Sequence, residues 1–279
     1  MASEAESTAM REAAALSALG LGTTSPNPPV GCVVLDRHGQ PVGSGYHSRK
    51  GDAHAETQAL ASAGDQANGG TAVVTLEPCN HDGLTPACRR VLLDAGITRV
   101  VIGVIDPTSR GEGGAAALRA AEVEVEVGVA LDEVRLVLEP WLTATARRWP
   151  YVTAAAVAEQ AVDELRGGVD CVLFPDGRIE EGIPGGHGPG MLRLPSLPWD
   201  FGDSAANLAT LFGGGVRTLL VIGDSEPSRA LHALELVDRA ILDLPREARG
   251  TLLPADFGLE SVSPTGDYVR ITVRRSPAR

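Results

Sequence analysis

One histidine and two cysteines form the side-chain set with the clearest chemical potential in the sequence. His54, Cys79 and Cys88 offer an imidazole and two thiolates, which together hold zinc through three protein ligands and leave the fourth tetrahedral position open to water. An open position is typical of catalytic zinc, because a structural site is closed by a fourth side chain. Glu56 follows the histidine by two residues, close enough to carry protons for a metal-activated water. The set predicts a hydrolytic zinc site.

The order of these residues matches the signature of zinc deaminases, with one departure. That signature is His-x-Glu, followed by Pro-Cys and a second cysteine. Here the segment 80–87 separates the two cysteines, which is longer than the usual spacing, so the second thiolate arrives over a longer loop. The alternative is a closed structural zinc site, for which His81 is the nearby fourth ligand.

The composition favours a small-molecule substrate over a nucleic acid or a membrane. A net charge of −12 and a pI near 4.9 weigh against nucleic acid, because affinity for phosphate backbones comes from clustered Lys and Arg. Aromatic residues at 4% leave few platforms for stacked bases. No apolar run is long enough to span a membrane, and the first residues lack the basic flank of an export signal. We expect a cytoplasmic protein.

The other two cysteines have a simpler interpretation. Four cysteines in a cytoplasmic chain argue for metal or thiol chemistry more than for disulfides. Cys32 and Cys171 lie in the apolar runs 30–35 and 169–174, where a cysteine behaves as a small buried hydrophobe.

The first half alternates helical and strand patterns. The expected helices are 4–19, 54–63, 87–95, 113–121 and 131–147, and the expected strands are 30–35, 41–46, 71–76, 99–105 and 123–129. Such alternation predicts a three-layer α/β/α sandwich around a largely parallel sheet. His54, Glu56 and Cys88 then lie in the first turns of two helices, whose positive ends favour thiolate over thiol.

The second half continues the alternation with more irregular segments. Strands are expected at 151–157, 169–174, 218–222, 240–244 and 268–273, helices at 207–212 and 228–236, and a Gly- and Pro-rich loop at 177–199. A chain of 279 residues suits two domains. We place them at residues 1–147 and 148–279.

The first half resembles the deaminase domain of the bifunctional riboflavin-biosynthesis deaminase/reductases. The resemblance covers about residues 8 to 148. It is carried by Ser25-Pro26-Asn27-Pro28, Val30-Gly31, Gly45-Tyr46-His47, Gly51, His54-Ala55-Glu56, Thr75-Leu76-Glu77-Pro78-Cys79, Thr85-Pro86-Ala87-Cys88 and Asp106-Pro107. It implies a cytidine-deaminase-like fold, zinc as cofactor, and hydrolytic removal of an exocyclic amine from a diaminopyrimidinone ribosyl phosphate. By the same resemblance, the substrate is contacted by Asn27, His47, His81 and Asp106.

Three positions depart from the family pattern near the expected phosphate site. Leu84 and Glu112 stand where the family has cations, and Thr108 replaces an asparagine. Because a phosphate gains much of its binding from cationic donors, these changes favour a substrate with less phosphate or a shifted phosphate site. Substitute cations are present at Arg49, Lys50 and Arg110.

The second half is similar to the reductase domain of the same family only in outline. The similarity lies in residues 163–173 and 236–238. The family has a lysine and a Ser-Leu-Asp-Gly turn where this chain has the residues 154–160. The Glu-Gly-Gly motif of the family is replaced by residues 222–224 of this chain. We predict a shortened, degenerate dihydrofolate-reductase-like α/β domain without reductase activity, kept as a packing or dimerisation module of a homodimer.

Three functional hypotheses follow. The first is a zinc hydrolase acting on the riboflavin-pathway pyrimidine. The second keeps the zinc chemistry but applies it to an unphosphorylated or modified aminopyrimidine, nucleoside or pterin-like ring in a specialised pathway. The third, from another class, is an NADPH-dependent reductase or a non-catalytic subunit.

Overall fold

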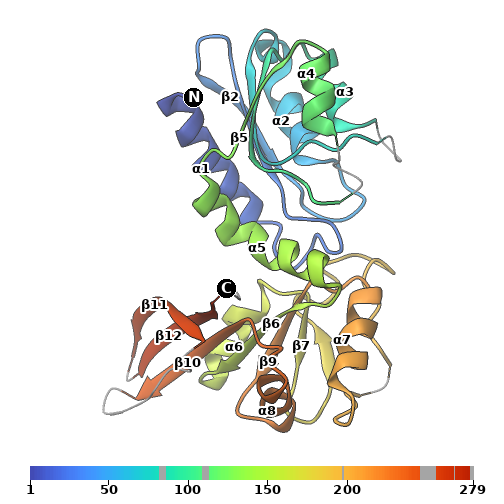
Figure 1. Cartoon of the computed structure of the whole chain (residues 1–279), viewed down its shortest axis with the longest axis vertical. Helices are drawn as coiled ribbons and strands as arrows, with labels where there is room; N and C mark the ends of the chain where they lie inside the picture. The colour runs from blue at the N-terminus through green and yellow to red at the C-terminus, as the bar shows by residue number, and fades with distance from the viewer. Residues whose placement is uncertain (82–85, 109–112, 197, 246–255, 267, 277–279) are drawn as a thin grey trace. The chain divides into compact units, whose positions relative to one another are not determined.

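The chain folds into two compact units, Met1–Leu142 and Thr143–Arg279 (Figure 1). The computed structural model describes residues 1–81, 86–108, 113–196, 198–245, 256–266 and 268–276. The division between the units falls inside helix α5 (Leu131–Arg147), a few residues before the boundary expected from the sequence.

The first unit is built on a sheet with the strand order β2-β1-β3-β4-β5. Its strands are β1 (Gly31–Leu35), β2 (Pro41–Tyr46), β3 (Thr71–Leu76), β4 (Arg99–Val104) and β5 (Glu124–Val127), and its helices are α1 (Glu4–Ala18), α2 (Ala55–Ala63), the 3-10 helix η1 (Gly64–Ala67), α3 (Cys88–Asp94), α4 (Gly114–Ala120) and the first part of α5. β3, β4 and β5 are parallel, whereas β1 pairs antiparallel with both β2 and β3. The sheet is therefore mixed rather than largely parallel, because a hairpin precedes the crossover strands.

Helices cover both faces of this sheet, as the predicted sandwich requires. Alternate residues of β1 point to opposite faces: Cys32 and Val34 pack in the core shared with α2, α3 and α4, while Val33 and Leu35 pack in the core shared with α1 and α5. Cys32 is fully buried and unpaired, which confirms its interpretation as a small core residue.

Two glycines of β2 bring helix α2 unusually close to the sheet. A Cβ on Gly43 would lie 2.3 Å from the carbonyl oxygen of Ala59, and a Cβ on Gly45 would lie 2.7 Å from the Ala59 nitrogen. Side chains at these positions would push α2 outward. The absence of Cβ atoms thus fixes the depth of the helix whose N-terminus carries His54 and Glu56.

The second unit contains a sheet with the order β11-β12-β10-β6-β9-β7-β8. Its strands are β6 (Tyr151–Ala156), β7 (Cys171–Leu173), β8 (Ile179–Glu181), β9 (Thr218–Ile222), β10 (Arg239–Pro245), β11 (Phe257–Thr265) and β12 (Tyr268–Arg275), and its helices are α6 (Glu159–Arg166), α7 (Ser204–Gly213) and α8 (Glu226–Ala233). The central strands β10, β6, β9 and β7 are parallel. Leu208, Leu211 and Leu231 from α7 and α8 pack on one face. Cys171 is fully buried, as expected.

Two edge strands of this sheet were not predicted. β8 lies within the segment expected to be an irregular loop, and β11 contains a glycine and a proline that weaken its strand pattern. Both are held by antiparallel pairing with a neighbouring strand, β7 for β8 and β12 for β11.

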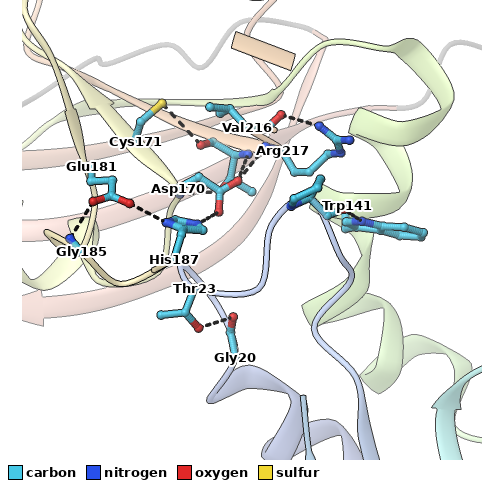
Figure 2. A network of polar contacts seen from close by, with 12 residues as sticks. Gly20, Thr23, Trp141, Asp170, Cys171, Glu181, Gly185, His187, Val216 and Arg217 are labelled. Atoms are coloured by element: carbon cyan, nitrogen blue, oxygen red, sulfur yellow. Dashed lines mark hydrogen bonds and ion pairs between the residues drawn. The ribbon is translucent and has the colours of Figure 1, made fainter. Parts of the chain in front are cut away.

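A buried histidine ties the glycine-rich segment after β8 to the sheet (Figure 2). His187 is fully buried, with Nε2 3.1 Å from Asp170 Oδ1 and Nδ1 3.1 Å from Glu181 Oε1. Asp170 is itself buried, and its Oδ2 accepts hydrogen bonds from the backbone nitrogens of Arg217 and Thr218 at 2.7 and 2.9 Å. Both imidazole nitrogens therefore face carboxylates, an arrangement satisfied fully only by the protonated ring.

This arrangement predicts a pH-dependent stability of the second unit. Burial by itself lowers the pKa of His187, but the hydrogen bonds and charges of Asp170 and then Glu181 outweigh it, so the pKa is raised above 6.5. A group whose pKa is raised on folding stabilises the folded state fully at pH values below its unfolded-state pKa. That contribution is lost as the pH rises through its folded-state pKa. We expect His187→Ala to lower the free energy of unfolding by about 3–5 kcal/mol at pH 6, and by less at pH 8.5.

Urea unfolding of the wild type and of His187→Ala between these two pH values measures the difference in their free energies of unfolding. His38→Ala, at an exposed turn of the first unit, is the control and should show no such trend. A penalty for His187→Ala that is constant with pH would show that the buried ring does not carry its proton.

Candidate metal centre

Three segments of the first unit bring the predicted ligands together. His54 is the N-cap of α2, Cys79 follows the end of β3, and Cys88 is the first residue of α3. His54 Nδ1 lies 3.2 Å from Cys88 Sγ and 3.7 Å from Cys79 Sγ, and the three ligand atoms all lie within 4.8 Å of one another. The long loop between the cysteines thus returns the second sulfur to the first.

The two sulfurs have the chemistry that zinc requires. The hydrogen bond with Cys88 is the largest influence on Cys79; together with those from His54 and the Cys88 backbone N–H it outweighs burial and lowers the pKa of Cys79 to about 4. The same contact with Cys79, followed by burial, raises the pKa of Cys88. Cys79 and Cys88 would hold a zinc ion as thiolates, and the ion would then replace the proton of their hydrogen bond. One imidazole and two sulfurs therefore fit a zinc ion.

Glu56 lies beside this cluster in the first turn of α2. Its side chain is only 3% exposed. Burial is the main cause that raises the pKa of Glu56, and the nearby His54 partly offsets it. A raised pKa makes the buried carboxyl of Glu56 a stronger base than an exposed glutamate, which suits a general acid–base group.

Asn27 and His47 form a second polar pair next to the ligands. Asn27 Nδ2 lies 3.2 Å from His47 Nε2, and His47 Nδ1 lies 3.3 Å from the carbonyl oxygen of Ala53. Burial lowers the pKa of His47, so the neutral ring donates from Nδ1 to Ala53 and accepts the Asn27 amide at Nε2. The His47 ring is 5.3 Å from the His54 ring. His47 thereby fixes which way the amide of Asn27 points.

The remaining predicted residues lie at the ends of neighbouring strands. Asp106 follows β4, and its Oδ1 accepts a hydrogen bond from Thr108 N at 2.8 Å. His81 lies two residues after Cys79 and is exposed. Among the described residues, it is not part of the group of possible metal ligands, so it does not act as a fourth ligand there. Leu84, Arg110 and Glu112, on which the phosphate argument depends, lie outside the described residues.

Glu77 is a buried acid of this site to which the sequence motifs gave no role. It lies between β3 and Cys79 and is 5% exposed. Its charged side chain directly before Pro-Cys was the available signal, because an acidic residue at the end of a buried strand is seldom without a partner.

Comparison with known proteins identifies the family of the first unit. Residues 3–104 match the model of the cytidine and deoxycytidylate deaminase zinc-binding region, a range that contains the predicted ligands His54, Cys79 and Cys88. The chain is 53% identical over 104 residues to the diaminohydroxyphosphoribosylamino-pyrimidine deaminase of Buchnera aphidicola, covering 37% of this chain and 70% of that protein. The chain belongs to this family of zinc-binding deaminases. The resemblance inferred from the motifs is confirmed.

Larger relatives extend the comparison. The riboflavin biosynthesis protein RibD of Aquifex aeolicus is 43% identical over 154 residues, 55% of this chain and 43% of that protein. The matched part thus spans less than half the length of that relative. A crystal structure of a Thermotoga maritima deaminase/reductase matches 97% of this chain and 99% of its own with a TM-score of 0.80 and 23% identity. The two-unit α/β fold predicted from the sequence is confirmed by this match.

No helix among the described residues has the length and apolar character needed to cross a membrane.

Proposed function

We propose that this deaminase-family chain is a zinc-dependent aminohydrolase acting on a diaminopyrimidinone ribosyl phosphate. The observation that carries the proposal is the convergence of His54, Cys79 and Cys88 on one point, with the buried Glu56 beside them. Three protein ligands are the set of a catalytic zinc, and the carboxylate is the proton carrier that hydrolysis needs. The relative in Buchnera aphidicola, whose name states this substrate, supports the choice of ring.

The reaction replaces a carbon–nitrogen bond by a carbon–oxygen bond and releases ammonia. When bound, zinc supplies a Lewis acid that acidifies water at its open position. Glu56 accepts the proton of the attacking water and returns it to the departing amine, so that one carboxyl serves as base and then as acid. Its burial keeps bulk water from competing for that proton. The ring nitrogen receives the second proton, and water is the only co-reactant.

Four side chains are proposed to face the substrate: Asn27, His47, His81 and Asp106. Asn27 presents its amide in the orientation set by His47, which allows it to discriminate donors from acceptors on the ring edge. Asp106 lies at the end of the strand next to the one that leads to Cys79, which supports a position at the same rim of the sheet.

The alternative substrate is an unphosphorylated or modified aminopyrimidine, nucleoside or pterin-like ring. It is favoured by Leu84 and Glu112, which stand in place of two cations. Arg49 is exposed and Lys50 is partly buried, and either would supply a replacement charge for a phosphate.

We propose that the second unit has the reductase fold without the activity. The residues 154–160 and 222–224 lack the lysine and the Glu-Gly-Gly of the resembled family. The unit then serves as a packing or dimerisation module of a cytoplasmic homodimer. Exposed Leu259 and Val262 on β11 support a contact surface there. A monomer by light scattering would contradict the dimerisation role and leave only the packing role.

Ammonia release from the phosphorylated and the dephosphorylated pyrimidine, measured side by side, tests the activity. We expect turnover of the phosphorylated compound; clear preference for the dephosphorylated one would instead support the alternative substrate. In the same assays NADPH should not be oxidised by the deaminated product, and steady NADPH oxidation would overturn the proposed loss of reductase activity. Release of ammonia from neither compound would contradict the aminohydrolase itself.

A further inference from the structure

Glu77 connects three segments of the first unit through its backbone and side chain. Its Oε1 accepts a hydrogen bond from the backbone nitrogen of Ala115 at 2.7 Å, and its Oε2 accepts one from the backbone nitrogen of Asp106 at 3.3 Å. Its own nitrogen donates to the carbonyl oxygen of Val104 at 2.9 Å. Both carboxylate oxygens are therefore engaged by backbone donors, so the side chain acts as a clamp between these segments.

The Glu77 side chain lies where the segment Pro78-Cys79 meets the Asp106 turn and the start of α4. Glu77 precedes Pro78-Cys79 directly, and Asp106 begins the turn that its own side chain closes through Thr108 N. On the other side, a Cβ on Gly114 would lie 2.2 Å from the carbonyl oxygen of Pro78, so the start of α4 packs directly on the same loop. One buried carboxylate thus sets the spacing between a zinc ligand, the Asp106 turn and α4.

We propose that Glu77 is a positioning residue of the deaminase, which fixes the place of Asp106 relative to the zinc ligand Cys79. The proposal rests on the proposed function, because it assigns Asp106 to the substrate. Glu77 acts on the ring only through Asp106: it holds the backbone of that residue, and the side chain of that residue meets the substrate. It affects substrate binding more than the chemical step, which depends on Glu56 and zinc.

A glutamine at position 77 breaks one of the two side-chain contacts. Its single carbonyl oxygen accepts only one of the two N–H groups, and the shorter bond to Ala115 is the one it keeps. Its amide nitrogen then opposes the N–H of Asp106, because two donors repel. Glu77→Gln therefore releases the Asp106 turn while Cys79 stays in place.

The first test separates positioning from mere stability. We expect Glu77→Gln to raise KM roughly 10- to 100-fold, the range for losing a hydrogen bond to a charged group, with kcat within about threefold and zinc content unchanged. Glu6→Gln, which alters another buried carboxylate of the same unit, at the cap of α1, is the control and should leave KM unchanged. An equal rise of KM in both variants would overturn the proposal. A loss of zinc from Glu77→Gln would overturn it as well.

A double-variant cycle tests whether the effect passes through Asp106. In an Asp106→Ala background, adding Glu77→Gln should change kcat/KM by less than about threefold, because the side chain being positioned is already absent. If the effects of the two substitutions on kcat/KM multiplied, Glu77 would not act through Asp106.

Hydrogen exchange gives a readout that does not depend on the substrate. In Glu77→Gln the backbone amide of Asp106 should exchange at least about tenfold faster, while the amide of Ala115 keeps its protection. If the wild-type chain deaminates neither pyrimidine, the proposed function fails, yet this selective exchange still supports the clamp. Unchanged protection at Asp106 would overturn it.

Discussion

Replacing Glu56 by glutamine is expected to lower kcat for ammonia release by roughly 10²- to 10⁴-fold, the range for removing a general acid–base group. The amide keeps the size of the side chain and its place in the first turn of α2, but it neither accepts the proton of the attacking water nor returns one to the amine. Because Glu56 is not among the three ligands, the variant should retain zinc. Ammonia assays and metal analysis of the same preparation measure both quantities.

An exposed glutamate provides the control for this variant. Glu12→Gln on α1 makes the same chemical change away from the cluster and should keep full activity. If Glu56→Gln remained within about tenfold of the wild type, another group would have to carry the proton. If it lost zinc, the residue would belong to the coordination sphere instead.

Replacing Cys88 by serine should remove zinc from the chain and all activity with it. A neutral hydroxyl is a poor substitute for a thiolate, and the residue is only 1% exposed, so water has little room to take over. Loss of a residue that only hydrogen-bonds to a zinc ligand lowers the metal affinity by up to about 100-fold. We expect loss of the ligand itself to lower the zinc affinity by more than that. Equilibrium dialysis against a zinc chelator measures it.

Cys32→Ser is the matched control for the loss of zinc. Cys32 is also fully buried in the first unit, but it packs in the core shared with α2 and α3 and is not part of the ligand group. Its substitution should cost stability and leave the zinc affinity unchanged. Equal zinc affinity in both variants would show that the sulfur of Cys88 does not bind the metal.

The elements around the metal could be predicted because their signals are local. Helix α2 follows from its composition, and the turn to Cys79 follows from the proline directly before the cysteine. The sandwich followed from alternating elements, although the antiparallel β1 made the sheet mixed. The family motifs supplied what spacing alone does not, namely that the longer loop still returns Cys88 to Cys79.

The parts that the sequence did not reveal depend on long-range contacts. β11 has a weak strand pattern and exists because β12 pairs with it. His187 lies in a glycine-rich segment whose composition indicates a loop, and only the fold places Asp170 and Glu181 on either side of its ring. Glu77 acquires its partners from two segments that follow it by about 30 and 40 residues. Such partners are set by tertiary structure, not by local propensity.

X-ray absorption at the zinc edge of the purified chain tests the central claim most directly. The account predicts one zinc per chain with two sulfur neighbours at about 2.3 Å and nitrogen or oxygen neighbours at about 2.0–2.1 Å, one of them an exchangeable water oxygen. A preparation that binds no zinc, or a zinc closed by four protein side chains, would contradict it.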